Sequence, residues 1–209
     1  AALGMNEDMI EIIRQAALLH DVGKIGIPEY ILNKPGRLTD EEYEVIKGHV
    51  EASIDIIRHL PSLDYVIPAV IGHHERYDGK GYPRRIAGED IPLTARILCV
   101  ADSFDAMTSR RCYKKAFPLE VAREKLLLDA GKQFDPDIAD VFLKLLDENR
   151  VAIDEDGDSD TEFEFERFIT SVMSTMNRQE ESEGFDFLTG LPMRNRGEKL
   201  AAQFMQQDN

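Results

Sequence analysis

The sequence of 209 residues predicts an all-α fold. Apolar residues recur at helical spacing in several segments, one segment opens with a helix-capping motif, and no stretch between turns shows the alternation of a β-strand. The hydrophobic content of 43% is ordinary for a globular protein and suffices for one well-packed domain with a small appendage. We therefore expect one helical domain over residues 1–150.

The first helix is expected at residues 7–20, where apolar residues such as Ile12, Ala16 and Leu19 recur at helix-like spacing. Gly23 follows it as a stop signal. Residues 24–38 are expected to be irregular, because prolines and a glycine interrupt them.

A second helix is expected to open at Thr39, because Thr39-Asp40-Glu41-Glu42 has the pattern of a capping box. In that motif the threonine hydroxyl accepts a backbone N–H of the first turn, and the glutamate accepts the threonine N–H in return. The helix is expected to run through His49 to about Leu60, where Pro61 ends it.

Four later helices and one glycine-rich loop complete the predicted domain. The helices are expected at residues 63–75, 93–108, 118–130 and 136–148. The loop follows the first of these four and reads Tyr77-Asp78-Gly79-Lys80-Gly81-Tyr82-Pro83. Its two glycines allow the backbone to approach a ligand closely.

The net charge of -15 is concentrated beyond this domain, since residues 154–186 hold 12 acidic and 2 basic residues. Such acidity argues against a polymeric nucleic acid as partner, although metals and a few cations would still hold a small anionic substrate. We expect residues 151–184 to be an acidic linker, with phenylalanines and methionines after residue 162 that line either a connecting helix or a partly ordered tail.

The sequence gives no sign of a membrane or secretory segment. No apolar run approaches the roughly 20 residues that cross a bilayer, and the N-terminus lacks the order of a secretory signal. Cys99 and Cys112 have no ligand-like spacing, so reduced, incidental thiols are expected. These features favour a cytoplasmic protein without direct membrane contact.

Several histidines and aspartates lie on or beside apolar helical faces, where an uncompensated charge would be costly. These candidate metal ligands are His20, Asp21, His49, His73, His74 and Asp102. Imidazole nitrogens and carboxylate oxygens suit Mn, Fe and Zn, and a carboxylate can bridge two cations. Each residue also has an ordinary interpretation: His20 as a helix cap, the His-His pair as surface, and Asp102 as a cap or ion-pair partner.

The residues around these ligands resemble the HD-GYP domain family over about residues 10–145. The similar segments are Leu18-Leu19-His20-Asp21-Val22-Gly23-Lys24-Ile25-Gly26-Ile27-Pro28, residues 31–39, His73-His74-Glu75-Arg76-Tyr77-Asp78-Gly79-Lys80-Gly81-Tyr82-Pro83 and residues 102–109. The resemblance implies an HD-domain helical bundle with a metal site, acting as a cyclic di-GMP phosphodiesterase that releases linear pGpG and in some members GMP.

The resemblance also implies roles for single residues. Two or three divalent metal ions, Fe or Mn, would be held by the six candidate ligands named above. Asp21 would bridge the metals and take part in catalysis with Lys24, which would contact the scissile phosphate. Further substrate contacts would come from Tyr82, Pro83, Arg111 and Lys114. Lys24, Arg111 and Lys114 could instead be solvated surface charges, and Lys115 could replace Lys114.

The chemistry of phosphodiester hydrolysis agrees with these roles. Paired cations activate water at neutral pH and polarise the phosphoryl oxygen. Lys24 would add a positive charge for the developing oxyanion, and Arg111 would grip a phosphate with two hydrogen bonds. Family members carry one more ligand on a helix before the His-Asp motif, and the chain is expected to be a fragment that lacks this helix.

Residues 185–209 resemble the start of a GGDEF domain in Asp186-Phe187-Leu188-Thr189-Gly190-Leu191-Pro192, with the alternative that this is a short match in a tail. Two other functions are weighed against hydrolysis of cyclic di-GMP. One is hydrolysis of another cyclic dinucleotide, such as cyclic GMP-AMP. The other is a catalytically inactive cyclic di-GMP sensor or protein-docking module. A homodimer and GGDEF-domain proteins are further partners that we consider.

Overall fold

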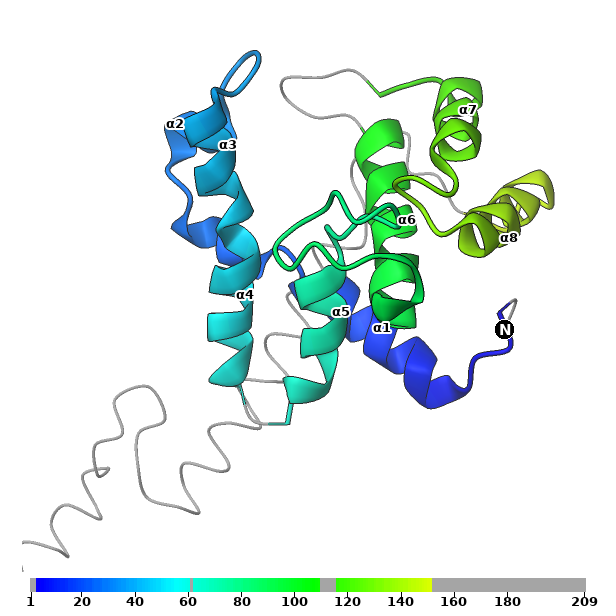
Figure 1. The fold of residues 1–209 in the computed structure, drawn as a ribbon, viewed down its shortest axis with the longest axis horizontal. Helices are drawn as coiled ribbons and strands as arrows, with labels where there is room; N and C mark the ends of the chain where they lie inside the picture. The colour runs from blue at the N-terminus through cyan, green and yellow to red at the C-terminus, as the bar shows by residue number, and fades with distance from the viewer. Residues whose placement is uncertain (1–2, 61, 110–115, 152–209) are drawn as a thin grey trace, which may run out of the picture. The chain divides into compact units, whose positions relative to one another are not determined.

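The computed structural model describes residues 3–60, 62–109 and 116–151, and these residues form helices joined by turns (Figure 1). The α-helices are α1 Glu7–Leu19, α2 Glu29–Leu32, α3 Asp40–Lys47, α4 His49–Arg58, α5 Ile67–Gly72, α6 Leu93–Thr108, α7 Leu119–Asp129 and α8 Pro136–Asp147. Three short 3₁₀ helices are η1 Val22–Gly26, η2 Asp64–Val66 and η3 Gly88–Asp90. No strand occurs within these ranges, which confirms the predicted all-α class.

Side-chain caps define where α1, α3 and α8 begin. Asn6 accepts a hydrogen bond from Met9 N at 2.9 Å at the start of α1. The predicted capping box opens α3, since Thr39 Oγ1 accepts from Glu42 N at 3.2 Å and Glu42 Oε2 accepts from Thr39 N at 2.7 Å. At the start of α8 the Asp135 side chain accepts hydrogen bonds from Asp137 N and Ile138 N. The sequence therefore encodes these helix starts locally.

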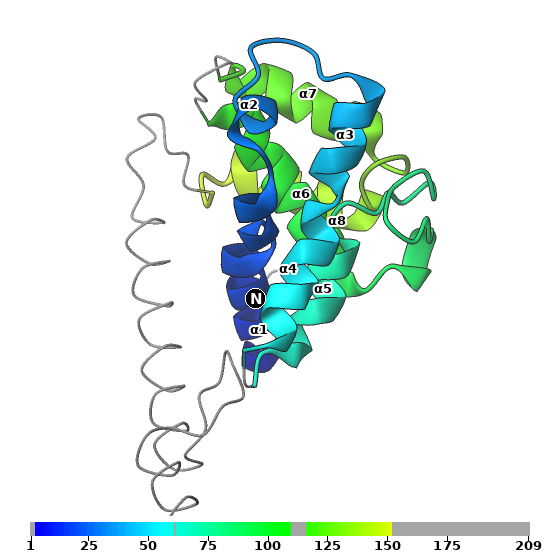
Figure 2. The same cartoon turned by 90° about the vertical axis from the view of Figure 1, so that its left-hand side faces the viewer.

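The long helix expected from Thr39 to Leu60 is interrupted at Gly48. α3 ends at Lys47 and α4 begins at His49, although the two helices follow one another along nearly one axis in both views (Figures 1 and 2). Glycine disfavours a helix interior by about 1 kcal/mol relative to alanine, which explains a break at this position. His49 therefore lies in the first turn of a helix.

Two other segments also differ from the expectation. The stretch predicted to be irregular, residues 24–38, contains most of η1 and all of α2. The helix predicted at residues 63–75 is divided into η2 and α5, and it ends before His73. Short turns of this kind lack the periodicity that a sequence pattern needs to be recognised.

Helices α1, α4, α5 and α6 pack around the predicted ligands. α5 contacts α1, α4 and α6, and η1 packs on α4. α7 and α8 pack on α6, on the side opposite α4 (Figure 1). Of the described residues, all except His59 and Leu60 belong to this one compact unit.

The acidic linker and the GGDEF-like segment predicted for residues 151–209 lie, apart from Val151, outside the described residues. Those predictions therefore remain predictions. None of the helices within the described ranges has both the length and the apolar character of a membrane-spanning helix.

Candidate metal centre

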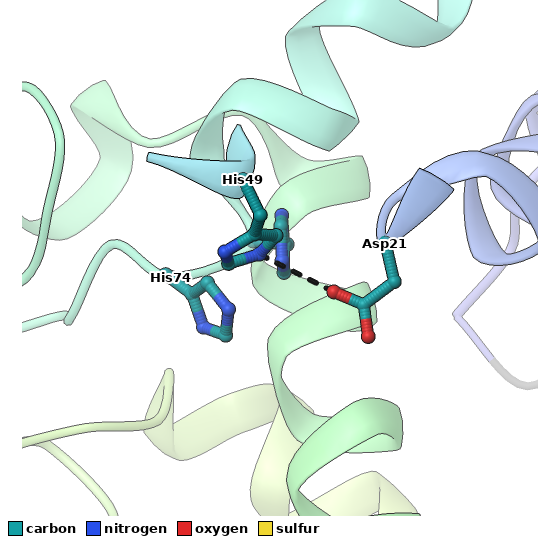
Figure 3. Close-up of side chains that lie close together, drawn as sticks. Asp21, His49 and His74 are labelled. Carbon is teal, nitrogen blue, oxygen red and sulfur yellow. Dashed lines mark ion pairs between the residues drawn. The ribbon is translucent and has the colours of Figure 1, made fainter. Parts of the chain in front are cut away.

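The ends of several helices bring the six predicted ligands together. His20 caps the C-terminus of α1, Asp21 follows it, and His49 opens α4. The remaining three come from the end of α5 and from α6. We call the whole set the ligand cluster: His20, Asp21, His49, His73, His74 and Asp102. Figure 3 shows three of its members, Asp21, His49 and His74, side by side.

A glycine and a serine place the His-Asp turn against α4. A Cβ atom on Gly23 would lie 2.2 Å from His49 O, so only glycine allows this approach. The fully buried Ser53 accepts from Gly23 N at 2.8 Å and donates to His20 O at 2.9 Å. These contacts fix His20 and Asp21 next to His49.

Hydrogen bonds to the backbone fix the tautomer of three histidines. The Nδ1 atoms of His20, His49 and His73 lie 2.7, 2.6 and 2.5 Å from the carbonyl oxygens of the residues three positions earlier. A carbonyl oxygen only accepts hydrogen bonds, so each Nδ1 carries the proton. In the neutral ring Nε2 then has a free lone pair, as in histidines that bind metals.

These three Nε2 atoms are buried and have no hydrogen-bond partner, and the same is true of Asp21 Oδ1. His49 Nε2 lies 3.2 Å from Asp21 Oδ1, and the dashed line in Figure 3 marks this approach. Two acceptor atoms at this distance repel each other unless a proton or a cation lies between them. Buried polar atoms without partners are rare in proteins and call for an explanation such as an ion. The residues present therefore fit a metal.

The ligand atoms form two groups that share Asp21. One group consists of Asp21, His49, His73 and His74, and the other of His20, Asp21 and Asp102; within each, the ligand atoms lie within 4.8 Å of one another. Asp21 Oδ1 faces His49, and Asp21 Oδ2 lies 3.4 Å from His20 Nε2. His20 Nε2 is also 3.6 Å from Asp102 Oδ1. Each of the two donor groups, which share one carboxylate, could hold a metal ion.

The protonation states suit metal binding. Burial lowers the pKa of His74 to about 4, and burial together with the neighbouring His74 and His20 lowers the pKa of His73 well below its ordinary value. Burial alone would raise the pKa of Asp21, but the adjacent histidines and Lys24 hold it far below its usual range. His73 and His74 therefore offer neutral imidazoles, and Asp21 offers an ionised carboxylate, at neutral pH.

His20 and Asp102 influence one another. Burial lowers the pKa of His20, but the carboxylates of Asp102 and Asp21 outweigh it, and the pKa lies above its ordinary value. Burial would raise the pKa of Asp102, and the nearby His20 lowers it instead. Asp102 therefore also contributes a negative charge.

Two of the predicted substrate contacts border the ligand cluster. Lys24 forms an ion pair with Asp21 Oδ2, which directs its ammonium group to the site. The Tyr82 ring lies over His74, with a centroid distance of 4.8 Å and an interplanar angle of 31°. Burial raises the pKa of Tyr82 above its ordinary value, so its phenol stays protonated. Pro83 follows Tyr82 through a cis peptide bond. The other two, Arg111 and Lys114, lie outside the described residues.

Glu75 is a residue that the sequence did not single out for a role. Its side chain is 2% exposed, and its Oε1 accepts hydrogen bonds from Arg84 N at 2.6 Å and Arg85 N at 3.1 Å. Glu75 thereby holds the chain that follows Tyr82, and Tyr82 N donates to His74 O at 3.2 Å. The signal in the sequence that could have identified Glu75 is its position directly after the His-His pair. For Ser53 the signal is its spacing of four residues from His49, which places both on one face of a helix.

Comparison with known proteins gives a family and several relatives. A family model described as "HD domain" matches residues 1–138. A protein of Thermotoga maritima named cyclic di-GMP phosphodiesterase is 44% identical over 161 residues, which is 76% of this chain and 44% of that protein. The Xanthomonas campestris cyclic di-GMP phosphodiesterase response regulator RpfG is 44% identical over 144 residues, or 68% of this chain and 38% of that protein.

A third relative is named for another cyclic dinucleotide. The 3'3'-cGAMP-specific phosphodiesterase 2 of Vibrio cholerae is 40% identical over 149 residues, or 69% of this chain and 28% of that protein. This chain thus matches less than half the length of each of the three relatives. The crystal structure of the cyclic GMP-AMP specific phosphodiesterase V-cGAP3 of V. cholerae matches with a TM-score of 0.53 and 20% identity, covering 91% of this chain and 45% of that one. This last likeness concerns the fold.

Proposed function

This chain belongs to the HD domain family, and we propose that it is a member of the HD-GYP type that hydrolyses cyclic di-GMP to linear pGpG, with GMP as the further product in some members of the type. The observation that carries the proposal is the set of buried imidazole Nε2 atoms that face Asp21 without hydrogen-bond partners. Relatives with 44% identity that are named cyclic di-GMP phosphodiesterases support the substrate.

The ligand cluster would hold two divalent metal ions, one at each of the two groups that share Asp21. The donors are imidazole nitrogens and carboxylate oxygens without a thiolate, which suits Fe or Mn. When bound, the ions supply Lewis acidity that activates water and neutralises charge on the phosphate. A third ion remains a prediction from the resemblance.

The chain's own residues would orient the substrate and stabilise charge. Lys24, held beside Asp21, would donate to a phosphate oxygen as negative charge develops there. Tyr82 and Pro83 would border the nucleotide beside His74. Arg111 and Lys114 would hold phosphate groups, a role that rests on the sequence alone. The backbone hydrogen bonds of His20, His49 and His73 keep the imidazoles oriented and so lower the cost of organising the site.

A second candidate substrate is 3'3'-cyclic GMP-AMP. The relative in V. cholerae that is 40% identical and named for this dinucleotide favours it. Both candidate substrates contain a 3'–5' phosphodiester and at least one guanine, so the ligand cluster serves either. A further alternative is a sensor or docking module that binds without turnover. A homodimer and GGDEF-domain partners remain predictions from the sequence.

A chromatographic assay tests the proposal with the full chain loaded with Fe(II) or Mn(II). The wild type should convert cyclic di-GMP to pGpG, and a His20→Ala, Asp21→Ala double variant should bind little metal and give no product. His59→Ala is the matched control, because His59 is the one histidine of the sequence that belongs to neither ligand group. This control should keep both metal and turnover.

The assay distinguishes the alternatives when metal content is measured beside it. Wild type with bound metal and no product from cyclic di-GMP would overturn the proposed substrate, and turnover of cyclic GMP-AMP would then identify the second candidate. Absence of both metal and product would favour the docking module.

A further inference from the structure

Two side chains of α3 that the proposed function does not use lie beside Tyr82. The Tyr43 and Tyr82 rings meet edge to face, with centroids 6.4 Å apart and an interplanar angle of 82°. The Lys47 ammonium lies over both rings, 4.8 Å from the centroid of Tyr43 and 5.7 Å from that of Tyr82. One turn of α3 separates Tyr43 from Lys47, so both point to the same side of the helix.

Tyr43, Lys47 and Tyr82 together form what we call the array, and it is accessible to a ligand. Tyr43 is 46% exposed, which leaves nearly half of a large aromatic side chain in contact with solvent. Lys47 is 24% exposed and pairs on the same helix with Glu44, which is 69% exposed. A pair whose carboxylate is this exposed contributes only about 0–1 kcal/mol, so Lys47 can exchange this partner for a ligand atom at low cost.

The array also lies next to the candidate metal centre. Tyr82 contacts His74 on one side and Tyr43 on the other. In a nucleotide a single ribose separates the base from its phosphate. A phosphate bound beside His74 would therefore bring its base to the region of Tyr43 and Lys47.

We propose that Tyr43 and Lys47 form a subsite for a guanine base of the substrate, an inference that rests on the proposed function. Aromatic rings bind any base by stacking, because every base has a π-face. Lysine adds selectivity, since guanine presents two acceptors, O6 and N7, on one edge. Adenine presents an amino donor beside N7 on the same edge, and this group opposes an ammonium. The subsite thus prefers guanine to adenine.

The test measures equilibrium binding of the linear dinucleotides pGpG and pApA to the full chain with Mn(II) present. Lys47→Met keeps the aliphatic stem and removes the charge, and it should weaken binding of pGpG roughly five- to tenfold while changing that of pApA by less than about twofold. Tyr43→Leu should weaken both ligands by roughly tenfold, since stacking does not depend on the base. With cyclic di-GMP as substrate, both variants should raise KM and leave kcat unchanged.

Matched controls remove similar groups elsewhere. Lys144→Met removes a lysine that pairs with a carboxylate on its own helix, Asp140. Tyr65→Leu removes a tyrosine that is 43% exposed, close to the value for Tyr43. Both should bind the two dinucleotides as the wild type does, and circular dichroism checks that every variant is folded.

The outcomes separate this inference from the proposed function. The guanine subsite is overturned if Lys47→Met weakens the binding of pGpG and pApA equally, or if it weakens the binding of neither. This holds even when the wild type hydrolyses cyclic di-GMP. If the wild type has no turnover but prefers pGpG through Lys47, the subsite stands and the phosphodiesterase proposal fails. A wild type that binds neither dinucleotide overturns the guanine subsite, and the turnover assay then decides the proposed function on its own.

Discussion

The two sides of α6 differ in how their buried polar groups are satisfied. One side carries Asp102 in the ligand cluster, and the other contributes Val100 and Phe104 to an apolar core with α7 and α8. We call this second region the α6–α8 core. Its buried members are Cys99, Val100, Phe104, Ala122, Leu126, Phe134, Ile138, Ala139 and Leu143.

Beside the α6–α8 core, buried polar atoms have partners. Asp135 accepts hydrogen bonds from Asp137 N at 2.9 Å and Ile138 N at 3.3 Å, and it forms an ion pair with Arg96. In the part of the chain that the structure describes, the buried side-chain atoms without hydrogen-bond partners belong to the ligand cluster and to Glu75. The contrast teaches that four of these five unsatisfied atoms lie where a bound ion would satisfy them, so the two regions should respond differently to mutation.

The largest expected effect separates function from folding in the ligand cluster. His49 is 1% exposed, and His49→Leu preserves its burial while removing a ligand atom. Metal content should fall, and turnover of cyclic di-GMP should fall at least about a thousandfold, equivalent to roughly 4 kcal/mol in the barrier. The metal-free variant should unfold within about 1 kcal/mol of the metal-free wild type, because leucine also removes an unsatisfied buried nitrogen.

Metal analysis, the chromatographic assay and urea denaturation after chelation measure these three quantities. A His49→Leu protein that is unfolded without metal would break the comparison, because His49 would then act as a structural residue.

The second-largest expected effect is a loss of stability, without a loss of metal binding, after a substitution in the α6–α8 core. Leu126 is fully buried, and Leu126→Ala should lower the free energy of unfolding by about 3 kcal/mol through lost burial and a cavity. Urea denaturation followed by circular dichroism measures the loss. The folded fraction should still bind metal with the stoichiometry of the wild type. Loss of metal from a folded Leu126→Ala protein would show that the two regions are coupled.

Metal binding itself should stabilise the wild type. An ion present at a hundred times its dissociation constant adds about 2.7 kcal/mol to the free energy of unfolding if it binds only the folded state. We expect thermal unfolding in Mn(II) to shift upward for the wild type and for Leu126→Ala. The same ion should leave His49→Leu nearly unchanged, and an equal shift in that variant would place the ion elsewhere.

The sequence predicted those features that short motifs encode. Thr39 and Glu42 predict the start of α3, and the His-Asp and His-His pairs lie within segments that resemble the HD-GYP family. The structure brings all six predicted ligands into the ligand cluster, while their binding of metal remains a prediction. Local patterns succeed here because the cap and the ligand spacing each depend on a few neighbouring residues.

Contacts between distant segments could not be predicted in this way. Gly23 meets α4 and Ser53 bonds to Gly23 across 30 positions, which no local periodicity reports. Tyr43 and Tyr82 meet only because α3 and the glycine-rich loop are folded together. The break at Gly48 was also missed, because the apolar pattern continues on both sides of it.

The smallest expected effect concerns Glu75. Like atoms of the ligand cluster, its buried Oε2 has no hydrogen-bond partner, but Glu75 belongs to neither ligand group. Glu75→Ala should free the N–H groups of Arg84 and Arg85, at a cost of about 1–2 kcal/mol. Because these bonds hold the chain next to Tyr82, KM for cyclic di-GMP should rise roughly tenfold with metal content unchanged. Glu75→Gln keeps a carbonyl oxygen at this position and should restore most of the loss. If Glu75→Ala loses metal, or if Glu75→Gln is equally impaired, Glu75 acts through its charge at the metal centre and the boundary between ligand and positioning residue moves to include it.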